Sequence, residues 1–204
     1  MPLVLPRMSS AVVIQQPITC PFAMSALPRY LPHYTLADYA LWKGEWELWQ
    51  GVPVAMSLSP FGRHQWVAGE IGYQFKQSLR EDCKDCFVLM ETDWIVSEDT
   101  VVRPDIGIVC GPFPERHIVE PPRLIVEVLS PSTEEKDRTA KRDLYASQSV
   151  QFYLLVDPAG KCIEAFQRDA DSGKYFAMPA AEKLAFELGS NCVARLDLWS
   201  LFRV

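Results

Sequence analysis

Residues 123–145, RLIVEVLSPSTEEKDRTAKRDLY, combine a strand and a helix in one short segment. The first eight residues are apolar apart from Arg123, Glu127 and a closing serine, which is typical of a central strand covered on both faces. The following Pro-Ser-Thr-Glu-Glu run predicts a helix that extends to about Ser147. Glu127 stands out, because ionised carboxylates are rare inside buried strands.

A second acid lies in a similar setting twenty residues earlier. The segment VVRPDIGIVC, residues 101–110, predicts a strand that carries Asp105. Side chains alternate along a strand, so Glu127 points to the face opposite Val126 and Val128, and Asp105 points opposite to Ile106. If the two strands are neighbours with both acids on one face, the carboxylates come close together.

Two carboxylates in one buried place repel each other and resist desolvation. A hard divalent cation such as Mg²⁺ removes both costs, and it commonly uses only one or two carboxylates plus water. Lys141 shares a helix face with Tyr145 and follows Asp137 by one turn, so its ammonium group could offset charge that develops beside such an ion.

Each residue alone also has a simpler interpretation. Asp105 could be a solvated acid on an exposed strand face, and Lys141 with Asp137 could be a surface ion pair at i, i+4. Glu127 is harder to explain in this way, because its strand reads as central. The combination of the three favours a site.

The rest of the chain predicts a mixed α/β or α+β domain. Thr35 to Asp38 is a capping box that opens a short helix, and residues 46–59 alternate around Gly51 as a hairpin. Apolar residues at every fourth position from Val67 predict a helix over residues 64–82. We expect two strands in 86–110, a strand and its hairpin mate in 150–168, and one or two short strands beyond residue 174. Residues 31–204 are expected to form a single domain, and residues 1–30 an N-terminal extension.

Composition restricts the function. The net charge of −6 argues against a protein that coats DNA through bulk positive charge. The sequence has no run of 18 apolar residues, so it predicts no membrane span. Six scattered cysteines fit a reduced, cytoplasmic setting best. Cys83 and Cys86 have CxxC spacing, but a structural zinc ion would need two more ligands, so we expect incidental thiols.

The ordered run RPDIGIV, PPRLIVEVLSPST, DRTAKRDLY and VQFYLLVDP, with YTLADY and WELWQGVPVAMS upstream, resembles the Uma family. Members of that family, formerly a domain of unknown function, are described as putative restriction endonucleases with the PD-(D/E)XK nuclease fold. The resemblance covers residues 34–168. It implies a restriction-endonuclease-like mixed β-sheet flanked by helices.

The resemblance also implies site residues. Asp105 and Glu127 match the metal-binding acids, and Val128 would add its backbone carbonyl. Leu129 stands where the nuclease motif usually has its lysine, and Lys141 matches the family's lysine that is displaced onto the next helix.

Glu47 and His64 match further polar positions of the family pattern, as an additional metal or water ligand and as a residue that touches substrate. Glu70, on the first long helix, could take the part of the extra acid instead, although a solvated helix flank is the simpler interpretation.

The resulting expectation is an endonuclease that uses Mg²⁺ or Mn²⁺ to activate water against the phosphodiester bonds of DNA. Two alternatives stay open: an inactive nuclease-fold module that binds nucleic acid or protein, and a phosphodiesterase for RNA or a small nucleotide. A homodimer is expected from the resemblance. The apolar tail, residues 196–204, could supply its interface or cover its own sheet.

Overall fold

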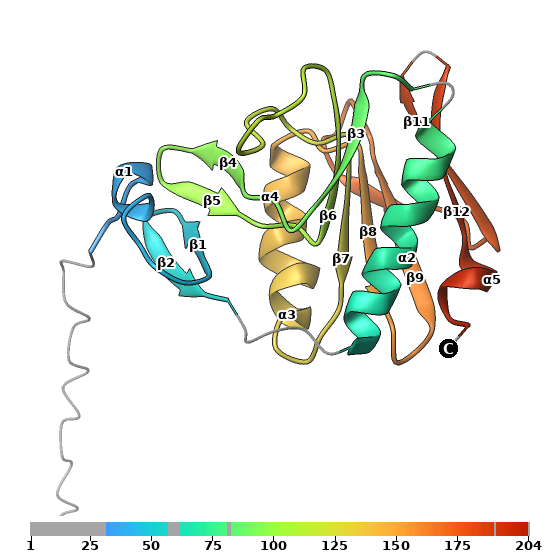
Figure 1. The fold of residues 1–204 in the computed structure, drawn as a ribbon, viewed down its shortest axis with the longest axis horizontal. Coiled ribbons are helices and arrows are strands. Elements are labelled where there is room, and N and C mark those ends of the chain that lie inside the picture. The colour runs from blue at the N-terminus through green and yellow to red at the C-terminus, as the bar shows by residue number, and fades with distance from the viewer. Residues whose placement is uncertain (1–31, 57–61, 81–82, 190, 204) are drawn as a thin grey trace, which may run out of the picture. The chain divides into compact units, whose positions relative to one another are not determined.

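The computed structural model describes residues 32–203 except 57–61, 81–82 and 190, and these belong to one compact unit that begins at Pro32. The predicted N-terminal extension, residues 1–30, lies outside the described residues. The unit is a mixed α+β structure, as predicted, with three sheets of six, four and two strands (Figure 1). None of the helices in these described ranges has the length and apolar character needed to cross a membrane.

The six-stranded sheet is the framework of the fold, and its order is β10-β9-β8-β7-β6-β3. The β7–β8 pair is parallel and the other four pairs are antiparallel, so the sheet is mixed. The predicted strand around Glu127 is β7, which lies in the interior of the sheet as expected. The six strands are β3 (Cys86–Met90), β6 (Ile106–Cys110), β7 (Leu124–Val128), β8 (Phe152–Asp157), β9 (Cys162–Arg168) and β10 (Tyr175–Ala177).

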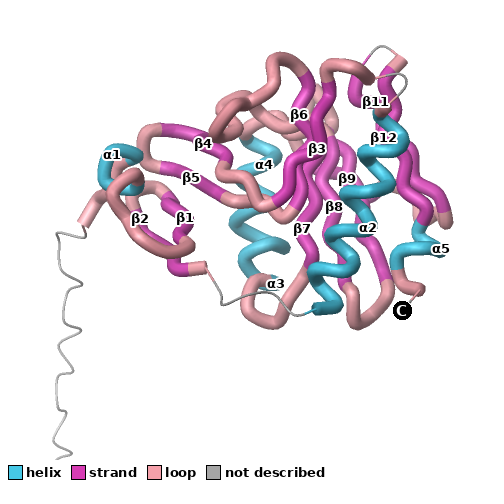
Figure 2. The backbone as a smooth tube through the Cα atoms, viewed as in Figure 1, coloured by secondary structure: helices cyan, strands magenta, loops and turns pink. Residues whose placement is uncertain are grey.

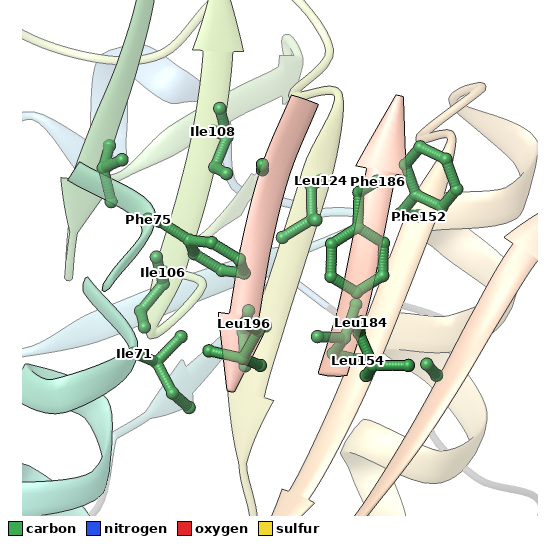
Figure 3. Packing of buried hydrophobic residues seen from close by; sticks show 14 of the residues in the cluster. Ile71, Phe75, Ile106, Ile108, Leu124, Phe152, Leu154, Leu184, Phe186 and Leu196 are labelled. Atoms are coloured by element: carbon green, nitrogen blue, oxygen red, sulfur yellow. The ribbon is translucent and has the colours of Figure 1, made fainter. Parts of the chain in front are cut away.

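One face of this sheet packs against α2 (Gly62–Leu79) and against the hairpin of β11 (Lys183–Gly189) and β12 (Cys192–Asp197) (Figures 1 and 2). The predicted stripe on α2 is confirmed, because all of its members are buried in this core: Val67, Ile71, Phe75 and Leu79. Figure 3 shows Ile71 and Phe75 of α2 directed toward side chains of β6 and β12. Burial of these large apolar side chains fixes the helix on the sheet.

The opposite face packs against one helical segment built from α3 (Glu134–Lys136), η1 (Asp137–Lys141) and α4 (Arg142–Ser147). The predicted helix is therefore present and ends at Ser147, but η1 has the wider π-helical turn. Such a turn changes which side chains face the sheet and is frequent at functional sites.

Residues 86–110 form four strands where two were expected, and the middle two of them belong to a second sheet of four strands, ordered β2-β1-β5-β4. The chain breaks at Glu91, whose φ is +47°, and again at Pro104, which has no N–H for a ladder. A turn at residues 98–99 joins the middle two of these strands. The four-stranded sheet consists of β1 (Trp46–Trp49), β2 (Val52–Ala55), β4 (Trp94–Ser97) and β5 (Thr100–Val102).

Two short helices complete the described residues. In α1 (Leu36–Tyr39) the predicted capping box is present, with the Thr35 N–H donating to the Asp38 carboxylate at 2.8 Å. The C-terminal region holds one more strand than expected, because β11 and β12 follow β10. The tail contains α5 (Leu198–Leu201), and its Leu201 is fully buried in the α2 core. The tail therefore covers its own sheet.

Candidate active site

Glu127 is buried near the end of β7, on the face that packs against α4. Its Oε1 accepts a hydrogen bond from the Tyr145 hydroxyl at 2.6 Å and lies 2.9 Å from Lys141 Nζ. As predicted, the neighbouring residues Val126 and Val128 point to the opposite face, into the α2 core. Strand alternation thus directs one carboxylate away from the apolar layer and toward the helical segment.

Asp105 lies one residue before β6 and is partly exposed. The antiparallel register pairs Ile106 with Val126, so the next position along places Asp105 across from Glu127. The Val128 N–H donates to Asp105 Oδ2 at 2.7 Å, which fixes this carboxylate at the end of β7. The prediction that neighbouring strands carry the two acids is confirmed, with Asp105 just outside its strand.

Lys141 is buried among acids rather than exposed as a surface pair. Its Nζ lies 2.9 Å from Glu127, 3.4 Å from Asp137 and 3.7 Å from Glu47. Both Lys141 and Asp137 are at most 4% exposed, so the surface interpretation of this i, i+4 pair is wrong. Burial alone would lower the pKa of Lys141, but the surrounding carboxylates outweigh it and raise that pKa well above its usual range. The ammonium group therefore stays charged.

Glu47, on β1, is fully buried and has donors at both oxygens. Oε1 accepts the Arg103 N–H at 3.1 Å, and Oε2 accepts from Trp49 Nε1 at 3.0 Å and Lys136 Nζ at 2.6 Å. Burial opposes its ionisation, but the charges of Lys141 and Lys136 win and lower the pKa of Glu47 to about 2. These contacts favour a role in holding the lysines.

The other two buried acids, Glu127 and Asp137, have raised pKa values. Burial, with added repulsion from Asp137 and Asp105, raises the pKa of Glu127 well above its usual range despite Lys141. Burial likewise raises the pKa of Asp137. We call the following six residues the charged cluster: Glu47, Asp105, Glu127, Lys136, Asp137 and Lys141. Four carboxylates face two ammonium groups in it, so negative charge is in excess.

His64, near the start of α2, lies beside the cluster. Its Nε2 is 3.4 Å from Asp105 Oδ2. Burial opposes the imidazolium, but the Asp105 carboxylate and the Val128 backbone overcome it and raise the pKa of His64. Two buried side-chain polar atoms of the described residues have no hydrogen-bond partner, and both are found here: His64 Nδ1 and Asp137 Oδ1.

Glu70 is not brought into this group. Its Oε1 accepts from Gln74 Nε2 at 3.1 Å, and Gln74 in turn binds Ser200 and the Asp197 carbonyl near α5. The contacts of Glu70 thus lie on the α5 side of α2. The helix-flank interpretation of this residue fits its position.

Sequence reasoning missed Lys136, Trp49 and the Arg103 backbone as partners of Glu47. Lys136 is separated from Glu47 by 89 residues, and nothing local in the sequence links them. Tyr145 was placed on the correct helix face, but its contact with Glu127 depends on how α4 packs against β7.

Metal-binding capacity rests on few ligands. In the part of the chain that the structure describes, no group of three or more His, Cys, Asp or Glu side chains could hold a metal ion as it stands. The oxygen donors near one another are the Asp105 and Glu127 carboxylates and the Val128 backbone carbonyl. In a strand the C=O and N–H of one residue point to the same side, so the Val128 carbonyl faces Asp105.

Two surface hollows lie elsewhere. One of about 630 Å³ is lined by residues that include Arg123, Gln151 and Arg168, and one of about 220 Å³ by residues that include Phe166 and Met178. No residue of the charged cluster lines either hollow.

Comparison with known proteins gives a consistent result. The family model Uma2, described as "Putative restriction endonuclease", matches residues 36–198. An uncharacterised protein of Synechocystis sp. is 38% identical over 80 residues, which are 38% of this chain and 42% of that protein's length. The crystal structure of a "putative nuclease belonging to DUF820" from Anabaena variabilis superposes with a TM-score of 0.66 at 16% identity, covering 83% of this chain and 97% of that one. The structural likeness establishes the shared fold.

Proposed function

Because this chain belongs to the Uma2 family, we propose that it is a metal-dependent endonuclease that hydrolyses phosphodiester bonds of DNA. One observation carries the proposal: Asp105, Glu127 and Lys141 come from three separate segments and meet at the end of β7. Buried like charges cost stability, so their retention in a nuclease-like fold points to chemistry.

The residues present fit a hard divalent cation. Asp105, Glu127 and the Val128 carbonyl would hold Mg²⁺ or Mn²⁺, because such ions take oxygen ligands and need only one or two carboxylates. The excess negative charge and the raised pKa of buried Glu127 are what a cation would relieve. When bound, the ion polarises a phosphoryl oxygen and makes bound water more acidic.

The chain's own groups would then orient the reaction. Lys141 stays protonated, so it can stabilise charge that develops on the phosphate and position the attacking water. Glu47 and Asp137 hold the Lys141 ammonium in place, and Tyr145 fixes one oxygen of Glu127. His64 would orient Asp105 and could meet the substrate from α2.

The alternative is a nuclease-fold module that binds nucleic acid or protein without cleaving it. Leu129 at the usual lysine position and the net charge of −6 favour this alternative. Cleavage by the wild type that is lost on removal of Asp105 separates the two.

The deciding experiment measures nicking of supercoiled plasmid DNA with Mg²⁺, Mn²⁺ or a chelator. The variants are Asp105→Asn and the matched control Asp171→Asn, which removes an exposed acid in a turn far from the cluster. We expect metal-dependent nicking by the wild type and the control only. If the wild type binds Mn²⁺ in calorimetry but cleaves none of plasmid DNA, RNA and small nucleotides, the binding module replaces the enzyme.

The proposal also covers the cellular location and the oligomeric state of the protein. A DNA substrate implies a cytoplasmic location, and a homodimer would let two sites reach both strands of a duplex. Light scattering of the chain with and without a short DNA duplex tests the dimer, with a monomer in both samples as the contrary result.

A further inference from the structure

Four cysteines from distant parts of the sequence gather at one place. Cys83 follows α2, Cys86 begins β3, Cys110 ends β6 and Cys192 begins β12. They form two disulfides, Cys83–Cys192 and Cys86–Cys110, and the Sγ atoms of Cys86 and Cys192 are 3.5 Å apart. The four sulfur atoms therefore make one continuous group. In the ribbon, α2 ends near the start of β3, at one end of the six-stranded sheet (Figure 1).

This group supplies the two further ligands that the CxxC pair lacks in the local sequence. Cys83 and Cys86 have the CxxC spacing of zinc sites, and the missing second pair is supplied by Cys110 and Cys192. Zinc at about 2.3 Å from each of four sulfurs in a tetrahedron separates those sulfurs by roughly 3.8 Å. The 3.5 Å between Cys86 and Cys192 is already close to that spacing.

We propose that Cys83, Cys86, Cys110 and Cys192 form a redox-dependent Zn²⁺ site, with four thiolate ligands when reduced and two disulfides when oxidised. In reduction, two molecules of a dithiol each give two electrons and two protons to one disulfide and become disulfides themselves. The four resulting thiols then release their protons as Zn²⁺ binds, and the oxidation state of zinc does not change.

The site would be structural. Four protein ligands leave no open position for a substrate or water, and Cys83 and Cys192 are buried. The ion would tie the β11–β12 hairpin to β3 and β6. Cys110 ends β6 while Asp105 precedes its start, five residues or about 16 Å of strand away. The inference is thus independent of the proposed nuclease chemistry.

The test uses the full chain carrying Cys20→Ser and Cys162→Ser, so that only these four cysteines remain; Cys162 is the exposed free thiol of the described residues. The chain is reduced with a phosphine without oxygen and titrated with Co²⁺ and then Zn²⁺. We expect one metal ion per chain in native mass spectrometry, the visible bands of tetrahedral cobalt thiolate, and their loss when Zn²⁺ displaces Co²⁺.

Matched variants on that background are Cys110→Ser and Cys192→Ser, each of which should weaken Zn²⁺ binding at least about 10-fold. Alkylation of the parent chain, which carries only Cys20→Ser and Cys162→Ser, gives a second readout, in which bound Zn²⁺ should protect its four remaining thiols. The proposal is overturned if the reduced chain, folded by circular dichroism, takes up no stoichiometric metal, if Zn²⁺ fails to protect the thiols, or if Cys192→Ser binds as tightly as its parent. Reduction that unfolds the chain without rescue by Zn²⁺ overturns it as well.

Discussion

The two ends of β6 differ in what they bury. At its start, Asp105 joins a group of carboxylates and lysines whose charges are only partly balanced. At its end, Cys110 is one of four cysteines that form two disulfides. Both ends assemble residues from distant segments, but the first does so against an electrostatic cost and the second gains constraint from each link.

The difference separates residues kept for chemistry from residues kept for stability. A whole buried ion pair can often be replaced by apolar residues without loss of stability, but removal of one partner is costly, and a cross-link limits the unfolded chain. Changes at the charged cluster should therefore alter cleavage, with an effect on stability that depends on which charge is left unpaired, and changes at the cysteines should affect stability alone.

The largest expected effect is on cleavage by Asp105→Asn. Loss of this carboxylate removes a proposed metal ligand from a partly exposed position, so activity should fall roughly 10³-fold with little change in melting temperature. Plasmid nicking and thermal unfolding measure the two quantities. If Asp105→Asn cleaves DNA normally, the start of β6 is not a site of chemistry and the contrast with its other end is wrong.

Lys141→Met should reduce the free energy of unfolding by about 3–5 kcal/mol, because it leaves Glu127 and Asp137 buried without their cation. Urea denaturation measures the change. The matched control is Lys183→Met, which breaks the exposed Lys183–Asp197 pair and should change stability by less than about 1 kcal/mol. Equal effects would mean that burial of the charges is unimportant.

Acid should remove the contribution of Glu47. Its pKa is about 2 when folded against 4.5 for the ordinary group, so its ionised form adds about 3 kcal/mol above pH 4.5. That stability is lost as the pH falls toward 2. Glu127 and Asp137 act in the opposite sense, because their raised pKa values make protonation favourable to the fold. Unfolding of the wild type and Glu47→Gln from pH 5 to pH 2 tests this, with a flatter curve expected for the variant.

Cys110→Ser tests the other end of β6 without reductant. It opens a loop between residues 24 positions apart and should cost about 2–3 kcal/mol of stability. DNA cleavage by the folded variant should match that of the wild type. A loss of activity in folded protein would join the two ends that we treat as independent.

The smallest expected change in stability is a gain from Glu127→Gln. The amide keeps an acceptor for Tyr145 and removes repulsion with Asp137 and Asp105, so stability at neutral pH should rise by about 1 kcal/mol while cleavage is lost. Denaturation and nicking are compared on the same preparation. A less stable variant would show that the Lys141 pair outweighs the repulsion.

Local pattern was enough for much of the fold. The α2 stripe, the hairpin turn and the central position of β7 follow from apolar periodicity and turn chemistry within a few residues. The hairpin was predicted from alternation around Gly51, and in the structure this glycine adopts a φ of +80°, which glycine does easily. Residues 86–110 were misread because β5 pairs with β1 and β4 pairs with β5, so both strands leave the six-stranded sheet, which local pattern does not reveal.

The sequence by itself determined which residues could act, since alternation set the directions of Glu127 and Asp105 and helical spacing set those of Lys141 and Tyr145. Only the tertiary structure decided their surroundings. The burial of Lys141, the Lys136–Glu47 contact and the arrival of Cys110 and Cys192 beside the CxxC pair all depend on segments far apart in the chain. The physical reason is range: side-chain periodicity acts over one or two turns, whereas desolvation and charge pairing are set by whatever the whole fold brings near.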